Sequence, residues 1–277
     1  MRWPDAQFEV KNRGNNMTDV TSQAPLPSIN PITRDDIQAA FKAGLADFQR
    51  APMYGLFFGF AFSIVGIAIA WTLFMGEAGV WIFPIAAGFP LLGPFAAVGI
   101  YEVSRRLETG EELGWAPILS AGFRQKNSQL PLFAVFTVFS FLVWIVLARV
   151  VFAVSFGTSA MTNVMSSFDL FFTGSGIVML FVGTIVGAAL ATLLFSVSVI
   201  AVPLLLDRDI DVITAMITSF SATLENRDAM LYWGAIVAAA TVVAMLPLFL
   251  GMILVFPALG HASWHVYRKV IGPDAAG

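Results

Sequence analysis

Residues 130–156 read LPLFAVFTVFSFLVWIVLARVVFAVSF, a run in which Arg149 is the only charged side chain. A helix crosses the hydrocarbon core of a bilayer with about 20 mostly apolar residues. Other regions that are long and apolar enough to cross are Met53–Met75, Val80–Tyr101, Gly174–Leu206 and Leu231–Val266. The sequence therefore predicts an all-α fold, a polytopic bundle of transmembrane helices.

The composition of the whole chain agrees with a membrane protein. Hydrophobic residues make up 58% of the 277 positions and charged residues only 12%, whereas a soluble domain has about 25% charged residues. The net charge of −3 gives no strongly basic surface for nucleic acid. The chain has no cysteine, which excludes disulfides, thiolate metal ligands and cysteine nucleophiles. The predicted partners are the lipid bilayer and other membrane-protein subunits.

The ends of the chain are predicted to lie outside the bundle. Residues 1–32 form a flexible lead-in, since residues 22–31 are rich in Pro, Ser and Asn and no apolar core of a secretory signal precedes them. Met17 offers an alternative start to Met1. We expect the transmembrane domain to span residues 33–270 and a short tail to follow over residues 271–277.

The basic residues indicate the topology. Fourteen of the 15 Lys and Arg residues lie outside the apolar runs, and such residues accumulate on the cytoplasmic side of a membrane. One span over residues 231–266 would place Arg268 and Lys269 on the opposite side from the other twelve. Two short spans with a turn near Pro247 place all fourteen on one side. We therefore expect six spans with both termini in the cytoplasm.

An internal repeat is also predicted. One constant offset relates Glu108, Glu112, Ala116, Ser120 and Asn127 to Asp207, Asp211, Ala215, Ser219 and Asn226, and a weaker third copy is Asp36, Ala40 and Gly44. Near these positions apolar residues recur at helical spacing, which predicts helices lying along the membrane surface, the first with the stripe Ile37, Phe41, Leu45 and Phe48. The predicted unit is one interfacial helix followed by a two-span hairpin, repeated over residues 33–104, 105–206 and 207–270.

His261 and His265, the only histidines, are one candidate site. Their spacing places both on one helix face, which suits two ligands of a small metal ion. A metal would need further ligands, and only Glu102 and Asp207 are expected at comparable depth. The favoured interpretation is hydrogen bonding at the headgroup boundary beside Trp264 and Tyr267. We expect no metal and no cofactor.

Arg149 and Glu102 are the other candidates. An ionisable residue inside a span marks a functional site by default, so Arg149 could line a solute pathway or pair within the bundle. Its side chain could instead reach the outer interface towards Asp169. Glu102 could pair with Arg105 or Arg106 one helical turn further on, as part of a cytoplasmic anchor.

Three segments carry a resemblance to a known family. They are FPLLGPF at residues 89–95, YEVSRRLE at residues 101–108 and PALGHASWHVYR at residues 257–268. Together they resemble an uncharacterised family of bacterial predicted integral membrane proteins, a domain of unknown function, over about residues 37–269. Some members are labelled cytochrome c oxidase subunit I-like, but a haem–copper centre needs several histidines on different helices. The resemblance implies a bacterial inner membrane and no particular activity.

Two functions from different classes remain. The favoured one is a non-enzymatic accessory or assembly partner of a larger inner-membrane complex, since the sequence has no catalytic constellation. The alternative is a small-solute transporter or channel. The repeat, Arg149 and the prolines Pro84, Pro90 and Pro94 in the second span favour this alternative, because interrupted helices form the substrate sites of many transporters. A membrane enzyme built on the two histidines comes third.

Overall fold

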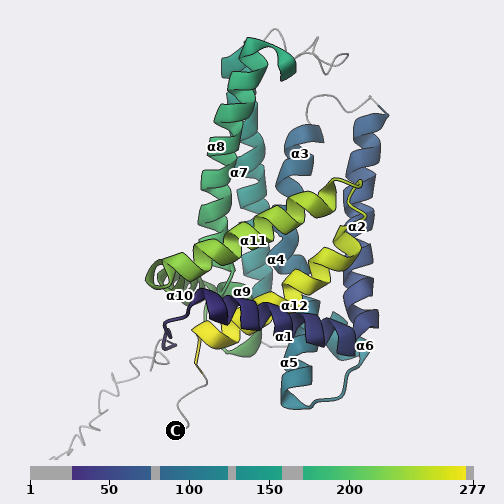
Figure 1. Ribbon diagram of the computed structural model, residues 1–277, viewed down its shortest axis with the longest axis vertical. Helices are drawn as coiled ribbons and strands as arrows, with labels where there is room; N and C mark the ends of the chain where they lie inside the picture. Colours follow the sequence, from purple (N-terminus) through teal and green to yellow (C-terminus); the bar gives the residue numbers. More distant parts are fainter. Residues whose placement is uncertain (1–26, 76–81, 124–128, 158–170, 273–277) are drawn as a thin grey trace, which may run out of the picture.

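A computed structural model describes residues 27–75, 82–123, 129–157 and 171–272, and it is helical almost throughout (Figure 1). The elements are α1 (Arg34–Arg50), α2 (Pro52–Phe74), α3 (Ile82–Gly88), the 3-10 turn η2 (Phe89–Leu92), α4 (Gly93–Ala96), α5 (Val98–Thr109), α6 (Trp115–Leu119), the 3-10 turn η3 (Ala121–Phe123), α7 (Leu130–Phe156), α8 (Gly174–Ser198), α9 (Ala201–Asp207), α10 (Val212–Glu225), α11 (Arg227–Met245) and α12 (Met252–Val270).

The predicted helical membrane bundle is confirmed. Within the described residues, five segments are long and apolar enough to cross a membrane, and they follow the predicted runs closely: Pro52–Thr72, Pro84–Thr109, Leu130–Phe156, Gly174–Asp207 and Arg227–Met245. Helix α12 is not among them, because its second half carries His261, His265, Arg268 and Lys269. The count of six spans stays a prediction.

The two ends of the described chain lie together. Ile29 and Ile271 form an antiparallel bridge, and the backbone N–H of Asn30 donates to the Val270 carbonyl at 2.8 Å. In Figure 1 the start of α1 and the end of α12 lie at the lower end of the bundle, whereas the end of α7 and the start of α8 lie at the upper end. Complete crossings between two adjacent ends must be even in number. Helices α11 and α12 therefore form a hairpin that enters the bundle and returns.

The hairpin turns near Pro247, as predicted, between Met245 and Met252. Leu248 and Phe249 take positive φ angles of 53° and 65° there, a conformation that side chains other than glycine rarely adopt. In Figure 1 this turn lies below the upper ends of α2, α7 and α8, so α11 and α12 do not reach as far along the bundle as these three helices.

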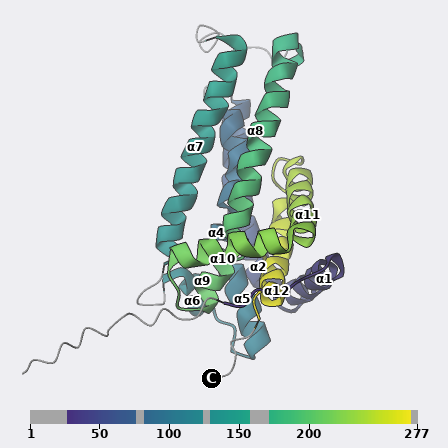
Figure 2. The ribbon, with the colours of Figure 1, turned by 90° about the vertical axis from the view of Figure 1, so that its left-hand side faces the viewer.

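Helix α12 occupies the middle of the lower half of the molecule, where it packs against α1, α2, α5 and α11 (Figure 2). Glycines allow the close approach. A Cβ on Gly44 of α1 would meet the backbone nitrogen of Ala262, and one on Gly59 of α2 would meet the carbonyl oxygen of Ile253. Helix backbones can come this near only where a glycine presents no side chain.

The second span is interrupted, as its prolines predict, into α3, η2, α4 and α5. Aromatic rings fill the break: the ring of Phe62 stacks on those of Phe89 and Phe256, each with centroids 4.3 Å apart. The Trp144 indole of α7 donates to the Pro84 carbonyl at 2.7 Å, so a carbonyl near the break is satisfied. The break is therefore a packed part of the apolar core.

The three predicted repeat units each begin with an element at the lower end, namely α1, α6 and α10. Helix α6 is short, spanning only Trp115–Leu119, and the equivalence of the units stays a prediction. The position of α1 on the membrane surface, predicted from its apolar stripe, stays a prediction. The residues of α1 that are buried within the protein are Ile37, Ala40, Gly44 and Asp47, whereas Leu45 is exposed. The small residues face inwards because α12, and not lipid alone, covers this face.

Candidate functional site

Polar side chains gather where α1, α5 and α12 meet. The first group, the histidine cluster, consists of Asp47 from α1, Ser104 from α5, and His261 and His265 from α12. Gly44 holds α1 against the backbone of α12, and a Cβ on Gly260 would lie 2.9 Å from Ile100 of α5. These close approaches bring side chains from three helices within hydrogen-bonding distance.

The Asp47 carboxylate is the acceptor of the histidine cluster. Its Oδ2 accepts from the Ser104 hydroxyl at 2.9 Å and lies 2.7 Å from His265 Nε2. The Ser104 Oγ lies 2.7 Å from His261 Nδ1. Because the hydroxyl proton points to Asp47, His261 Nδ1 donates to Ser104 and Nε2 carries the lone pair. The four side chains thus form one chain of hydrogen bonds.

The electrostatics of Asp47 favour its ionised form. Burial alone would raise the pKa of this carboxyl, but the hydrogen bonds from His265 and Ser104 lower it below its usual value. His261 is fully buried with its ring stacked on Phe48, centroids 6.2 Å apart. Within the described residues His261 Nε2 has no hydrogen-bond partner.

Glu102 lies next to the histidine cluster on α5 and is the centre of an ion-pair group. Its Oε2 lies 2.8 Å from Arg105 Nε and its Oε1 lies 2.7 Å from Arg106 Nε, which confirms the predicted pairing. Arg105 also binds Glu111 at 2.7 Å, beyond the turn at Gly110. Glu102 is buried, and a buried carboxylate is stable only when it is paired in this way.

Three carboxylates surround the basic end of α12. Arg268 lies 2.9 Å from Glu108 and 3.3 Å from Asp207, and Lys269 lies 3.0 Å from Asp36. Trp264 donates to Glu108 and Tyr267 to Asp207, at 3.0 and 2.6 Å. Glu108 and Asp207 are equivalent positions of the predicted repeat, and both bind the same helix.

The structure brings together three of the four predicted site residues. Glu102, His261 and His265 lie at the same junction, but Glu102 binds arginines and not the histidines. Arg149 is exposed near the end of α7 that joins α8, at the opposite end of the bundle. Asp169, its predicted carboxylate partner, lies outside the described residues.

Both histidines form hydrogen bonds, as expected, but His261 forms them in the interior and not at the headgroup boundary, whereas His265 is partly exposed. His261, Trp264 and Tyr267 are fully buried between helices, because α12 is enclosed by its neighbours. Across the described ranges, no group of three His, Asp or Glu side chains has a geometry that could hold a metal ion. The two acids considered as further ligands are bound otherwise, Glu102 by arginines and Asp207 by Tyr267 and Arg268.

Two residues of the cluster, Asp47 and Ser104, were not predicted. A signal for Asp47 exists in the sequence: it follows Ile37, Ala40 and Gly44 at helical spacing, so an inward-facing carboxylate needs a buried partner. Ser104 carries no comparable signal. Hydrogen bonds and ion pairs at this junction connect α1, α5, α9 and α12 and hold the four helices in one arrangement.

A comparison with known protein families matches part of this chain. Residues 82–207 match a family described as predicted integral membrane protein (DUF2189). The match includes α5 with Glu102 and Ser104, while α1 and α12, which complete the junction, lie outside it. Over the matched residues, which are less than half of the chain, the protein is similar to a family of predicted integral membrane proteins without an assigned function. Searches of the curated proteins and of the solved structures found no match.

Proposed function

We propose that this protein is a non-enzymatic accessory or assembly partner of a larger membrane complex, and that α8 is the surface on which a partner docks. The observation that carries the proposal is the exposure of α8. In the Gly174–Asp207 segment only 6% of the most apolar stretch is buried, against 33% for Pro52–Thr72 and 39% for Pro84–Thr109. Helix α8 packs mainly on α7 and α10, which leaves most of its circumference uncovered.

Lipid alone can cover an apolar helix, so exposure needs a second feature. Gly187 of α8 lies against Trp144 of α7, where a Cβ would stand 3.1 Å from the indole, whereas a Cβ on Gly183 would meet Val151 at an ordinary 3.8 Å. Gly183 and Gly187 form a face of small residues on α8, and the part of this face around Gly183 is thus not needed for packing on α7. Small residues permit close contact between helices in lipid, where packing replaces the hydrophobic effect.

The polar junction supports a non-enzymatic role. Ser104 and His261 have no exposed surface, so a substrate could not reach the hydroxyl or the imidazole without separating α1 from α12. The interruption of the second span is packed with rings of Phe62, Phe89 and Phe256, which supports a structural kink over a solute pathway.

We infer that the protein lies in a bacterial inner membrane with the lower end of Figure 1 on the cytoplasmic side, and that both termini are cytoplasmic. The end of α5, the start of α11 and the end of α12 lie at that end and carry Arg105, Arg106, Arg227, Arg268 and Lys269. Basic residues of this kind favour the cytoplasmic side.

Site-specific photo-cross-linking in native membranes tests the docking surface. Phe181 of α8 and Phe60 of α2 form a matched pair, since both are exposed phenylalanines on apolar helices, 67% and 56% exposed. A photoreactive phenylalanine at position 181 should give one discrete protein adduct, and the same side chain at position 60 only lipid adducts. The adduct should be the protein that co-purifies in mild detergent.

The proposal is wrong if position 181 gives no protein adduct, or gives the same distribution as position 60. An adduct at twice the mass of the chain would mean that a second copy of this chain, and not a different subunit, docks on α8. Movement of a solute by the purified protein alone in liposomes would favour the transporter instead.

A further inference from the structure

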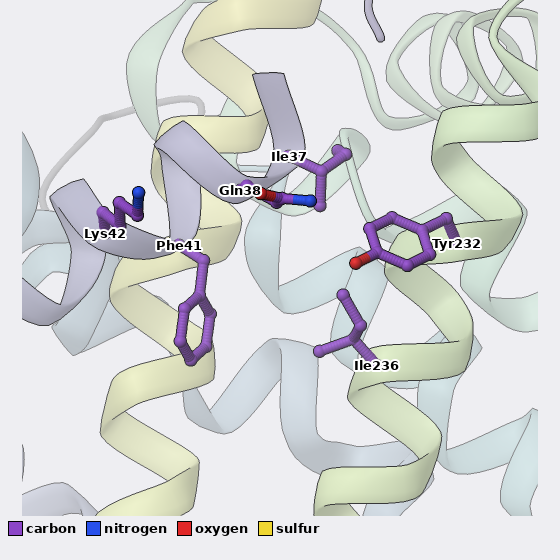
Figure 3. Close-up of a pocket in the computed structure, with 6 residues that line it drawn as sticks. All are labelled: Ile37, Gln38, Phe41, Lys42, Tyr232 and Ile236. Atoms are coloured by element: carbon purple, nitrogen blue, oxygen red, sulfur yellow. The ribbon is translucent and has the colours of Figure 1, made fainter. Parts of the chain in front are cut away.

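A pocket of about 220 Å³ lies between α1 and α11 (Figure 3). Ile37, Gln38, Phe41 and Lys42 of α1 line one side, and Tyr232 and Ile236 of α11 line the other. Figure 3 shows the Tyr232 hydroxyl directed towards α1 across the opening. The lining is mostly apolar, with a cation, an amide and a phenol among its six residues and no carboxylate.

Lys42 differs from the other cations of the helices around the polar junction. Every other Lys or Arg of α1, α5 and α12 lies within 4 Å of a carboxylate oxygen: Arg34, Arg50, Arg105, Arg106, Arg268 and Lys269. Lys42 is exposed and has no hydrogen-bond or ion-pair partner among the described residues. Its positive charge is therefore available to a ligand.

The charges next to the pocket do not cancel the positive charge of Lys42. Arg34 lies over the Tyr232 ring, 5.4 Å from its centroid, and binds Asp228 at 2.6 Å. That pair is neutral as a unit, so the rim of the pocket keeps the single charge of Lys42. An apolar pocket with one cation at its edge fits a molecule that has an apolar chain and an anionic head.

The position of the pocket agrees with such a molecule. Helix α1 lies across the lower end of the bundle and turns at Ala51 into α2, which runs up through the apolar region (Figure 1). The pocket opens between α1 and the rising helix α11. A ligand there can place its head beside α1, at the level of the headgroups, and its chain along Ile236.

We propose that this pocket binds an anionic phospholipid, with an acyl chain between Phe41 and Ile236 and the phosphate headgroup at Lys42. A single Lys near a membrane surface favours an anionic lipid by about fivefold. Tyr232 and Gln38 supply donors to the headgroup oxygens. The site is separate from α8, and it does not depend on the proposed docking of a partner.

Native mass spectrometry of the purified full chain in detergent tests the site, with dioleoyl phosphatidylglycerol and dioleoyl phosphatidylcholine as probes. We expect the wild type to bind the phosphatidylglycerol about fivefold more tightly. Lys42→Gln should remove this preference. Arg227→Gln is the charge control, because Arg227 is an exposed cation at the start of α11 without an ion-pair partner in the described chain and does not line the pocket.

A second variant tests the apolar part of the pocket without disturbing the core. Gln38 is exposed at the rim, so Gln38→Trp should close the opening and weaken both lipids severalfold. Gln49→Trp places the same side chain at an exposed position of α1 outside the pocket and should leave binding unchanged.

Equal binding of the two lipids by the wild type, or an unchanged preference in Lys42→Gln, would overturn the proposal. So would tight binding of oleic acid with no competition by phosphatidylglycerol, which would make the ligand a fatty acid. If Gln38→Trp and Gln49→Trp behave alike, the lipid binds elsewhere on the surface.

Discussion

Asp47 lies on the buried face of α1 and accepts hydrogen bonds from one residue of α5 and one of α12. In Asp47→Asn the amide oxygen can still accept both hydrogen bonds, but the negative charge that strengthens them is lost. We expect the free energy of unfolding to fall by about 1–3 kcal/mol. Asp35→Asn, at an exposed position of the same helix, should change it by less than about 0.5 kcal/mol. Thermal unfolding in detergent measures both, and equal effects would mean that the cluster adds no stability.

Asp36 gives a prediction for pH. The hydrogen bonds from the Thr33 backbone, from Lys269 and from the Thr33 hydroxyl lower its pKa from 3.8 to about 2. Since the folded pKa lies below the unfolded one, this stabilisation is present above about pH 4 and is lost as the pH falls from about 4 to 2. The midpoint difference between wild type and Asp36→Asn should therefore shrink over that range. A difference that stays constant down to pH 2 would contradict the assignment.

At the scale of elements, the contact between α1 and α12 depends on Gly44. A Cβ there would meet the backbone of His261 and Ala262, which cannot move aside as a flexible side chain can. We expect Gly44→Ala to lower the free energy of unfolding by about 1–3 kcal/mol. Gly183→Ala on α8 is the control, since its Cβ would make an ordinary contact with Val151 and alanine is the better helix former. Unfolding in detergent should separate the two, and an unaffected Gly44→Ala protein would show that the helices can shift.

The elements were predictable to a different degree from the site. Apolar length is a local property, so the spans around Leu130–Phe156 and the turn near Pro247 follow from the sequence within a few residues. The pairing of Glu102 with Arg105 was likewise local, one helical turn apart. Asp47 and Ser104 are 57 residues apart, and no pattern along the chain joins them. Their contact depends on how α1, α5 and α12 pack.

At the scale of the whole molecule, the paired ends predict the sidedness of the loops. The absence of native cysteine makes single cysteines clean reporters for an impermeant maleimide. Phe172→Cys, beside the start of α8, should react from outside the cell, and Glu112→Cys, after α5, only once the membrane is opened. Reaction of both from the same side would contradict the fold.

The turn between α11 and α12 decides the number of crossings. Leu246 is 76% exposed at this turn. Labelling of Leu246→Cys from outside would establish six complete spans, as the distribution of basic residues predicts. Labelling from neither side would mean that the hairpin ends within the bilayer and returns, leaving four complete crossings.

The position of α12 has a consequence for biosynthesis. His265 meets Asp47 across 218 residues, and at about 5–20 residues per second a ribosome needs roughly 10–45 s to make that length. During this interval α1 is already inserted, with its inner carboxylate and Gly44 uncovered. The nascent bundle is open along this face until translation reaches α12. A chaperone or membrane protease that recognises the uncovered face of α1 could therefore distinguish unfinished chains from finished ones.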